Sequence, residues 1–245
     1  MGLDLFPEEC DVPNHTTLPF LVGKANPKLE KWGFDKGWWH SRRPESMFQV
    51  YHFPDCDEPI DVVASPKCCS SSIKQIWSML VLNDHPGSLE NPHAGVREMN
   101  YQRHNVTAKN PWRENSLRIA IKRDPIDRAF SAATYILTSR YKMMVILPDD
   151  YERFFFGVNH TLRYDPHLIP QYKLLGTDVS FYDHVYDVKE YNQFFKKIKD
   201  KYSLTLETNH KKKQMYSSTS IEDLSESCIE RIKYLYRYDY QYGWC

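Results

Sequence analysis

The stretch VVASPKCCSSSIKQIW, residues 62–77, decides how the chain folds. Its apolar beginning, within DVVAS at 61–65, predicts a short buried strand of the kind found in parallel sheets. Four apolar residues after the polar loop recur at helical spacing: Ile73, Ile76, Trp77 and Leu80. This stripe predicts an amphipathic helix from about Ser71, so the stretch is a strand, a tight polar loop and a helix.

A second unit of the same kind follows along the chain. LRIAIKR at 117–123 predicts a strand, and Pro125 stands where the first turn of a helix tolerates proline. The strongest helical stripe of the chain comes next: Ile126, Ala129, Phe130, Ala133, Ile136 and Leu137. Because strands that alternate with helices favour a parallel sheet covered by helices, the expected fold class is α/β with a central parallel sheet.

The remaining pattern fits one domain over residues 1–245. Further strands are expected at 47–53 and 184–188, and Ser225 is placed to cap a last helix. Another helix is expected from the spacing of Tyr191, Phe194, Phe195, Ile198 and Tyr202. The proline-rich and tryptophan-rich segment 1–55 is expected to be irregular and to lie on the acceptor side of the site.

The composition is that of an ordinary globular protein. Of the 245 residues 41% are hydrophobic, and 32 basic residues balance 32 acidic ones, so nothing demands a nucleic-acid partner. No apolar run reaches membrane-spanning length, and the first residues lack the pattern of a signal peptide. The six cysteines show no CxxC spacing, which is typical of reduced thiols. We therefore expect a cytoplasmic protein.

The polar loop of the first unit has the chemistry of an anion site. A helix that begins at the carboxyl end of a parallel strand presents unpaired N–H groups and the positive end of its dipole. Three serine hydroxyls, at 70–72, and the Lys67 ammonium add donors and charge. The order of residues differs from that of a Walker A loop, because the lysine comes first and no glycine is present. A plain turn with a serine cap is an equally good interpretation of this loop alone.

The second unit strengthens the anion-site hypothesis. Arg123 ends the strand, and its planar fork of donors suits a phosphate group. Ser131 follows about two helical turns later. The alternative is a set of surface ion pairs among Arg123, Asp124, Asp127 and Arg128, and this alternative fits Arg128 better than Arg123.

Together, PKCCSSSIK at 66–74 and RDPIDRAFS at 123–131 resemble the two cofactor motifs of sulfotransferases that use 3′-phosphoadenosine 5′-phosphosulfate (PAPS). The carbohydrate-type, family-2-like branch is the most similar. The resemblance extends to HLIPQ at 167–171, FYDHVYDVKEY at 181–191 and the stretch 229–244, and it covers roughly 60–245. The loop departs from the family in its run of serines, and SAATY lacks the earlier tyrosine that is common there. The resemblance implies a P-loop-like sulfotransferase fold.

The resemblance also implies which residues bind the cofactor. The 5′-phosphosulfate would be held by Lys67, Cys69, Ser70, Ser71, Ser72 and the amide of Ile73. Arg123 and Ser131 would bind the 3′-phosphate, and Lys213 in the basic run 209–214 would add a contact. A solvated run of charges is the alternative interpretation of 209–214, and it suits this run better. Lys67 would also neutralise the leaving phosphate, so no metal is expected. The product would be adenosine 3′,5′-bisphosphate.

Transfer to a hydroxyl benefits from a base with a pKa near neutrality. Among the ten histidines, His104 precedes the RDP strand as a histidine does in the wider superfamily, and Glu98 is the second candidate. His167 is a third, although a role in orienting substrate together with Gln171 suits it better. Trp39 is expected to contact the acceptor.

The expected function is transfer of a sulfuryl group to a hydroxyl, or to an amine, of a small metabolite or sugar. The expected partner is that acceptor, with no nucleic acid, no membrane span and a possible homodimer. One alternative is a small-molecule kinase on a related scaffold. The other is a nucleotide-binding or sulfated-glycan-binding protein without catalysis.

Overall fold

The computed structural model describes residues 50–53, 58–82, 112–139, 141–157, 167–202 and 219–245. Its strands are β1 (Val50–His52), β2 (Ile60–Ala64), β3 (Leu117–Lys122) and β4 (His184–Asp187). Its α-helices are α3 (Ser70–Leu82), α5 (Pro125–Ser139), α6 (Pro148–Gly157), α7 (Gln171–Leu175), α8 (Tyr191–Tyr202), α9 (Glu226–Leu235) and α10 (Arg237–Gln241). Short 3-10 turns occupy Val179–Phe181, Val188–Glu190 and Ile221–Asp223.

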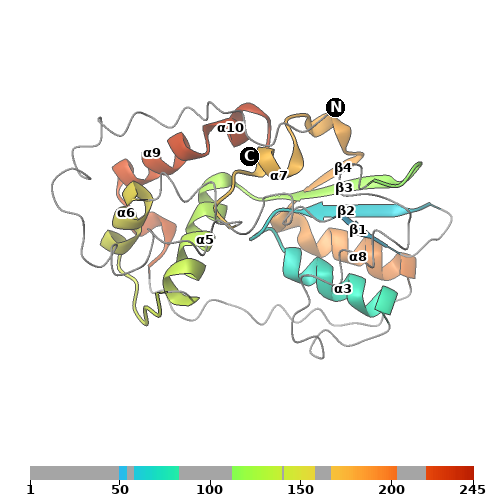
Figure 1. The fold of residues 1–245 in the computed structure, drawn as a ribbon, viewed down its shortest axis with the longest axis horizontal. Coiled ribbons are helices and arrows are strands. Elements are labelled where there is room, and N and C mark those ends of the chain that lie inside the picture. Colours follow the sequence, from blue (N-terminus) through green and yellow to red (C-terminus); the bar gives the residue numbers. More distant parts are fainter. Residues whose placement is uncertain (1–49, 54–57, 83–111, 140, 158–166, 203–218) are drawn as a thin grey trace, which may run out of the picture.

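The strands form one sheet in the order β1-β2-β3-β4. β2, β3 and β4 run parallel, and β1 pairs with β2 in the antiparallel sense. The register sets Ala64 of β2 opposite Ile121 of β3, so the loops that follow these two strands leave the same edge of the sheet (Figure 1). The expected α/β class with a mostly parallel sheet flanked by helices is confirmed.

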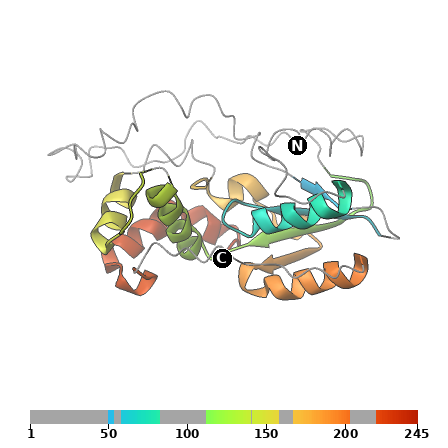
Figure 2. The same ribbon diagram turned by 90° about the horizontal axis from the view of Figure 1, so that it is seen from below.

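The two faces of the sheet carry different cores because successive strand residues point to opposite sides. Val62 and Ile119 face α3 and α8, which lie side by side across this face (Figure 2). Val63 and Ala120 face a second cluster that includes Ile169, Leu174, Leu175, Tyr182 and Trp244. A third cluster joins α5, α6 and α9 beyond the carboxyl edge of the strands.

The elements expected from the sequence lie where the patterns placed them. β2 and β3 occupy most of the predicted strands, and α3 begins at Ser70, one residue before the predicted start. The Ser225 hydroxyl accepts the N–H of Cys228 at 3.2 Å and so caps α9. The single-domain prediction stays a prediction, because residues 1–49 lie outside the described part. None of the described helices combines the length and hydrophobicity that crossing a bilayer requires.

A buried polar cluster ties the strands together at the amino half of β2. Asp61 is fully buried and lies 2.7 Å from His52 Nδ1. Its carboxylate also accepts hydrogen bonds from Arg113 N and Nε, at 2.8 and 2.7 Å, and from the Ser116 hydroxyl at 2.8 Å. Burial alone would raise the pKa of Asp61, but the hydrogen bonds and charges of His52 and Arg113 outweigh it and hold that pKa below its usual value.

Replacing Asp61 by alanine removes the buried carboxylate that lies 2.7 Å from Arg113 Nε. We expect the free energy of unfolding at pH 7 to fall by about 3–5 kcal/mol, measured by urea denaturation. Because the folded-state pKa is lowered, the contribution of Asp61 is present above the unfolded pKa and is lost as the pH falls through the folded value. Asp200→Ala, at an exposed position of α8, is the control and should change stability by less than about 0.5 kcal/mol. Equal effects of the two substitutions would contradict this role of Asp61.

Candidate functional site

The loop between β2 and α3 is a strained turn at the carboxyl edge of the sheet. Lys67 and Cys69 both adopt left-handed backbone conformations, with φ of 70° and 57°. Each such residue costs about 1–3 kcal/mol and persists only where its surroundings hold it. The N–H of Cys68 donates to Ser65 O at 3.0 Å, which closes the turn. The helix α3 begins directly after it, at Ser70.

The first amides of α3 differ in what they already bind. The N–H groups of Ser72 and Ile73 donate to Cys69 O at 2.9 and 3.0 Å, and the Ile73 side chain is fully buried. The N–H groups of Ser70 and Ser71 come before the first intrahelical bond, so these two amides are the ones able to meet an anion. Ile73 is therefore a core residue whose N–H already has an acceptor, which argues against the predicted cofactor contact.

Arg123 lies against this loop. Its Nη1 donates to Lys67 O at 3.3 Å, and its backbone N–H donates to the side-chain oxygen of Gln171 at 3.0 Å. Arg123 Nε is buried and has no acceptor within the described part of the chain, so donor capacity remains on its guanidinium. The structure thus brings together the two charged elements that the sequence identified separately.

Arg128 has a different position from the one the sequence suggested. The alternative of a surface ion pair does not hold for Arg128, because this residue is fully buried. Its Nε donates to Pro66 O at 3.1 Å, and its Nη2 donates to Ile169 O at 2.7 Å. Arg128 therefore joins the α3 loop to the segment before α7. The predicted apolar stripe of α5 does not include Arg128, so no sequence signal pointed to its burial one turn before the buried Ala132.

Gln171 also belongs to the scaffold. It is fully buried, and its side-chain nitrogen donates to Arg123 O at 2.8 Å and to Trp244 O at 3.0 Å. Its side-chain oxygen accepts the N–H of Arg123. These contacts join three segments of backbone and leave the amide no direct access to an acceptor. The predicted contact of Gln171 with substrate is not supported by this geometry.

Asp239, in α10, supports Gln171 and was not among the predicted site residues. Its carboxylate accepts the N–H of Gln171 at 3.0 Å and that of Tyr172 at 2.8 Å, at the start of α7. Burial raises the pKa of Asp239 to about 6, against the charge of Arg128 and these hydrogen bonds, which lower it. A polar residue between the aromatic residues of the last turn was the only signal in the sequence.

Lys67 and His167 meet at one aromatic ring. The Lys67 ammonium lies 4.8 Å from the centroid of the Tyr135 ring, and the His167 ring lies 4.6 Å from the same centroid. Ser131 stands four residues before Tyr135, so both lie on the same side of α5. The predicted residues Lys67, Ser131 and His167 thus occupy neighbouring elements.

Burial disfavours the thiolate form of both cysteines in this loop. It raises the pKa of the Cys69 thiol to about 12, and it also raises the pKa of the Cys68 thiol. Both groups stay protonated at neutral pH. The Cys68 thiol contacts the Ser65 hydroxyl at 3.0 Å and so helps to close the turn. The remaining predicted site residues lie outside the described part of the chain: Trp39, Glu98, His104 and Lys213.

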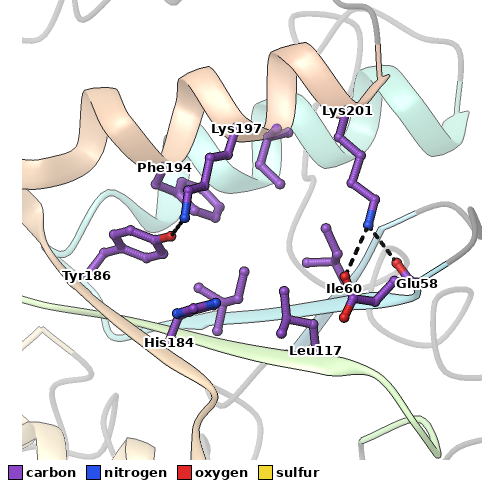
Figure 3. A pocket seen from close by; sticks show the side chains of 10 residues that line it. Glu58, Ile60, Leu117, His184, Tyr186, Phe194, Lys197 and Lys201 are labelled. Carbon is purple, nitrogen blue, oxygen red and sulfur yellow. Dashed lines mark hydrogen bonds and ion pairs between the residues drawn. The ribbon is translucent and has the colours of Figure 1, made fainter.

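A groove on the other half of the molecule does not coincide with this site. It lies between α8 and the amino halves of the strands, and Leu117 and Ile119 contribute to its apolar floor. Figure 3 shows Lys197 reaching Tyr186 Oη, at 2.8 Å, and Lys201 reaching Glu58 O, at 2.9 Å. Lysines that lie over apolar surface in this way commonly cover the flank of a helix. We therefore place the functional site at the carboxyl edge.

Comparison of the chain with protein-family models, with curated proteins and with solved structures gave no match.

Replacing Asp239 by asparagine tests the role of its buried carboxyl group, which accepts the N–H groups of Gln171 and Tyr172. In the wild type the folded-state pKa, about 6, lies above the unfolded value of about 3.9, so the native state keeps a proton that the unfolded chain loses. The contribution of Asp239 to the free energy of unfolding is therefore complete at low pH. This contribution, about 2–3 kcal/mol, is lost as the pH rises from about 4 to 6.

The measurement is the free energy of unfolding of both proteins across this pH range. The difference in the free energy of unfolding between wild type and Asp239→Asn should change by about 2–3 kcal/mol between pH 4 and pH 6.5, because asparagine does not titrate. Gln193→Ala, at an exposed position of α8 without a titratable group, should give a difference in the free energy of unfolding that does not depend on pH. A constant difference for Asp239→Asn would show that its carboxyl does not titrate as stated.

Proposed function

We propose that the protein is a PAPS-dependent sulfotransferase that acts on a hydroxyl, or an amine, of a small metabolite or sugar. The observation that carries the proposal is the contact between Arg123 Nη1 and Lys67 O. It places the lysine of one motif and the arginine of the other at one edge of the sheet. A nucleotide with charged groups at both ends of its ribose needs such a pair of neighbouring cations.

The proposed binding mode follows from the donors around this edge. The 5′-phosphosulfate lies at the start of α3, where the Ser70 and Ser71 amides, the helix dipole and the Lys67 ammonium all favour an anion. The 3′-phosphate lies against the Arg123 guanidinium and the Ser131 hydroxyl. The proposed fold is accordingly the sulfotransferase variant of the α/β class, and the proposed location is the cytoplasm.

The proposed reaction needs alignment and charge neutralisation. The acceptor oxygen attacks sulfur in line with the bond to the leaving phosphate, and that sulfur–oxygen bond breaks as the new one forms. Lys67 neutralises the charge that develops on the leaving phosphate oxygen. His104, or Glu98 in its place, takes the proton from the acceptor hydroxyl. No step of this reaction requires a metal ion.

A small-molecule kinase is the main competing function. The loop 65–69 holds no glycine and does not have the Walker A order, which disfavours a triphosphate bound with magnesium. A binding protein without catalysis would keep the same anion site. Binding of adenosine 3′,5′-bisphosphate distinguishes a sulfotransferase from a kinase. Turnover of PAPS distinguishes a sulfotransferase from a binding protein without catalysis.

Arg123→Ala should weaken binding of adenosine 3′,5′-bisphosphate by about 1.5–3 kcal/mol, because it removes charged hydrogen bonds to the 3′-phosphate. Isothermal titration calorimetry measures this affinity directly. The effect on adenosine 5′-phosphate, which lacks the 3′-phosphate, should be much smaller. Arg153→Ala removes the same charge at an exposed position of α6 and should leave both affinities unchanged.

Two outcomes of this titration would contradict the proposal. Tight binding of Mg·ATP without binding of the bisphosphate would support the kinase instead. An equal loss of affinity for the two adenosine phosphates in Arg123→Ala would show that this arginine does not contact the 3′-phosphate.

His104→Ala should lower turnover by about 10²–10⁴-fold while it leaves the bisphosphate affinity unchanged, because a general base acts on the acceptor and not on the cofactor. Glu98→Gln is the parallel variant that tests the second candidate base. A matching loss of bisphosphate affinity in His104→Ala would instead assign His104 a structural role.

A further inference from the structure

Tyr135 has no part in the proposed function as described so far, yet it contacts two residues of the site. The Lys67 ammonium lies 4.8 Å from its ring centroid, and the His167 ring lies 4.6 Å from it at an interplanar angle of 38°. The Tyr135 side chain is 36% exposed, so these contacts are not a by-product of packing in a closed core. They join the β2–α3 loop, α5 and the segment before α7.

The contact with Lys67 has a clear physical basis. The face of an aromatic ring carries negative potential and attracts an ammonium ion within about 6 Å of its centroid. The backbone of Lys67 is already fixed, since its carbonyl accepts from Arg123 Nη1 and the preceding carbonyl accepts from Arg128 Nε. These bonds act on the backbone, and the Tyr135 ring acts on the ammonium end of the side chain.

A restrained ammonium is useful for an anion-binding lysine. A lysine side chain loses much rotamer freedom when it is fixed on a ligand, and this loss weakens binding. Groups that are ordered before the ligand arrives avoid that loss. An ammonium held on a ring therefore binds the same phosphate more tightly than one that moves freely in solvent.

We propose that Tyr135 is a positioning residue that holds the Lys67 ammonium at the entrance of the β2–α3 loop. The same ring also contacts the His167 imidazole. The consequence for catalysis rests on the proposed function. The ring contact itself is a property of the protein without ligand.

A series of fluorinated phenylalanines at position 135 tests the proposal. Each fluorine weakens the negative potential of the ring face and changes its shape very little. The affinity for adenosine 3′,5′-bisphosphate, measured by calorimetry, should fall stepwise from phenylalanine through 4-fluoro- to 3,4,5-trifluorophenylalanine, by about 2–5-fold in total. Tyr135→Phe should stay within about 2-fold of the wild type, because it keeps the ring.

Two controls separate positioning from a general structural effect. In a Lys67→Met background the fluorinated residues should no longer change the affinity, because the ammonium is absent. Tyr234→Leu, at a tyrosine of α9 with 37% exposure, should leave the affinity unchanged. The proposal would be overturned if fluorination did not change the bisphosphate affinity with Lys67 present. It would also be overturned if fluorination lowered the affinity equally in the Lys67→Met background.

A measurement without ligand distinguishes failure of this inference from failure of the proposed function. In the NMR spectrum of the free protein, the ring current of Tyr135 should shift the Lys67 ε-protons upfield, and Tyr135→Leu should abolish that shift. If the shift is present but the bisphosphate does not bind, the sulfotransferase proposal fails and the ring contact stands. If the bisphosphate binds and the shift is absent, the role of Tyr135 alone is refuted.

Discussion

The parallel pairing of β2 with β3 is the constraint on which the rest of the site depends. Because Ala64 lies opposite Ile121, the loop that carries Lys67 and the loop that carries Arg123 leave neighbouring strands at the same edge. In open α/β sheets this carboxyl edge is where ligands bind. A shift of this register would turn each buried side chain of β3 to the other face and would separate the two loops.

The strained loop is held by polar side chains from distant parts of the chain. Arg128 and Arg123 donate to the carbonyls of Pro66 and Lys67, and these bonds offset the left-handed conformations of Lys67 and Cys69. Gln171 fixes the backbone of Arg123, and Asp239 in turn fixes the backbone of Gln171. The geometry that we propose for anion binding is therefore present in the free protein, which is the arrangement expected where a site must be ready before its ligand arrives.

The sequence predicted local structure well and buried polar partners poorly. The strands and the start of α3 follow from periodicity and loop chemistry, so β2, β3 and the start of α3 could be placed within about one residue. The roles of Lys67 and Arg123 rest on the chemistry of their motifs and stay predictions. For Arg128 the sequence favoured a surface ion pair, because the acceptors of its buried guanidinium, such as Ile169 O, lie far along the chain. Asp239 and Gln171 form contacts across 68 residues, and no local pattern encodes such a contact.

The central claim is that one nucleotide spans the two motif loops. A crystal structure of the protein with adenosine 3′,5′-bisphosphate tests this claim most directly. The account predicts one ordered molecule, with its 5′-phosphate at the Ser70 and Ser71 amides beside Lys67 and its 3′-phosphate against Arg123 and Ser131. Density for the nucleotide at any other place, or a 3′-phosphate that does not contact Arg123, would contradict it.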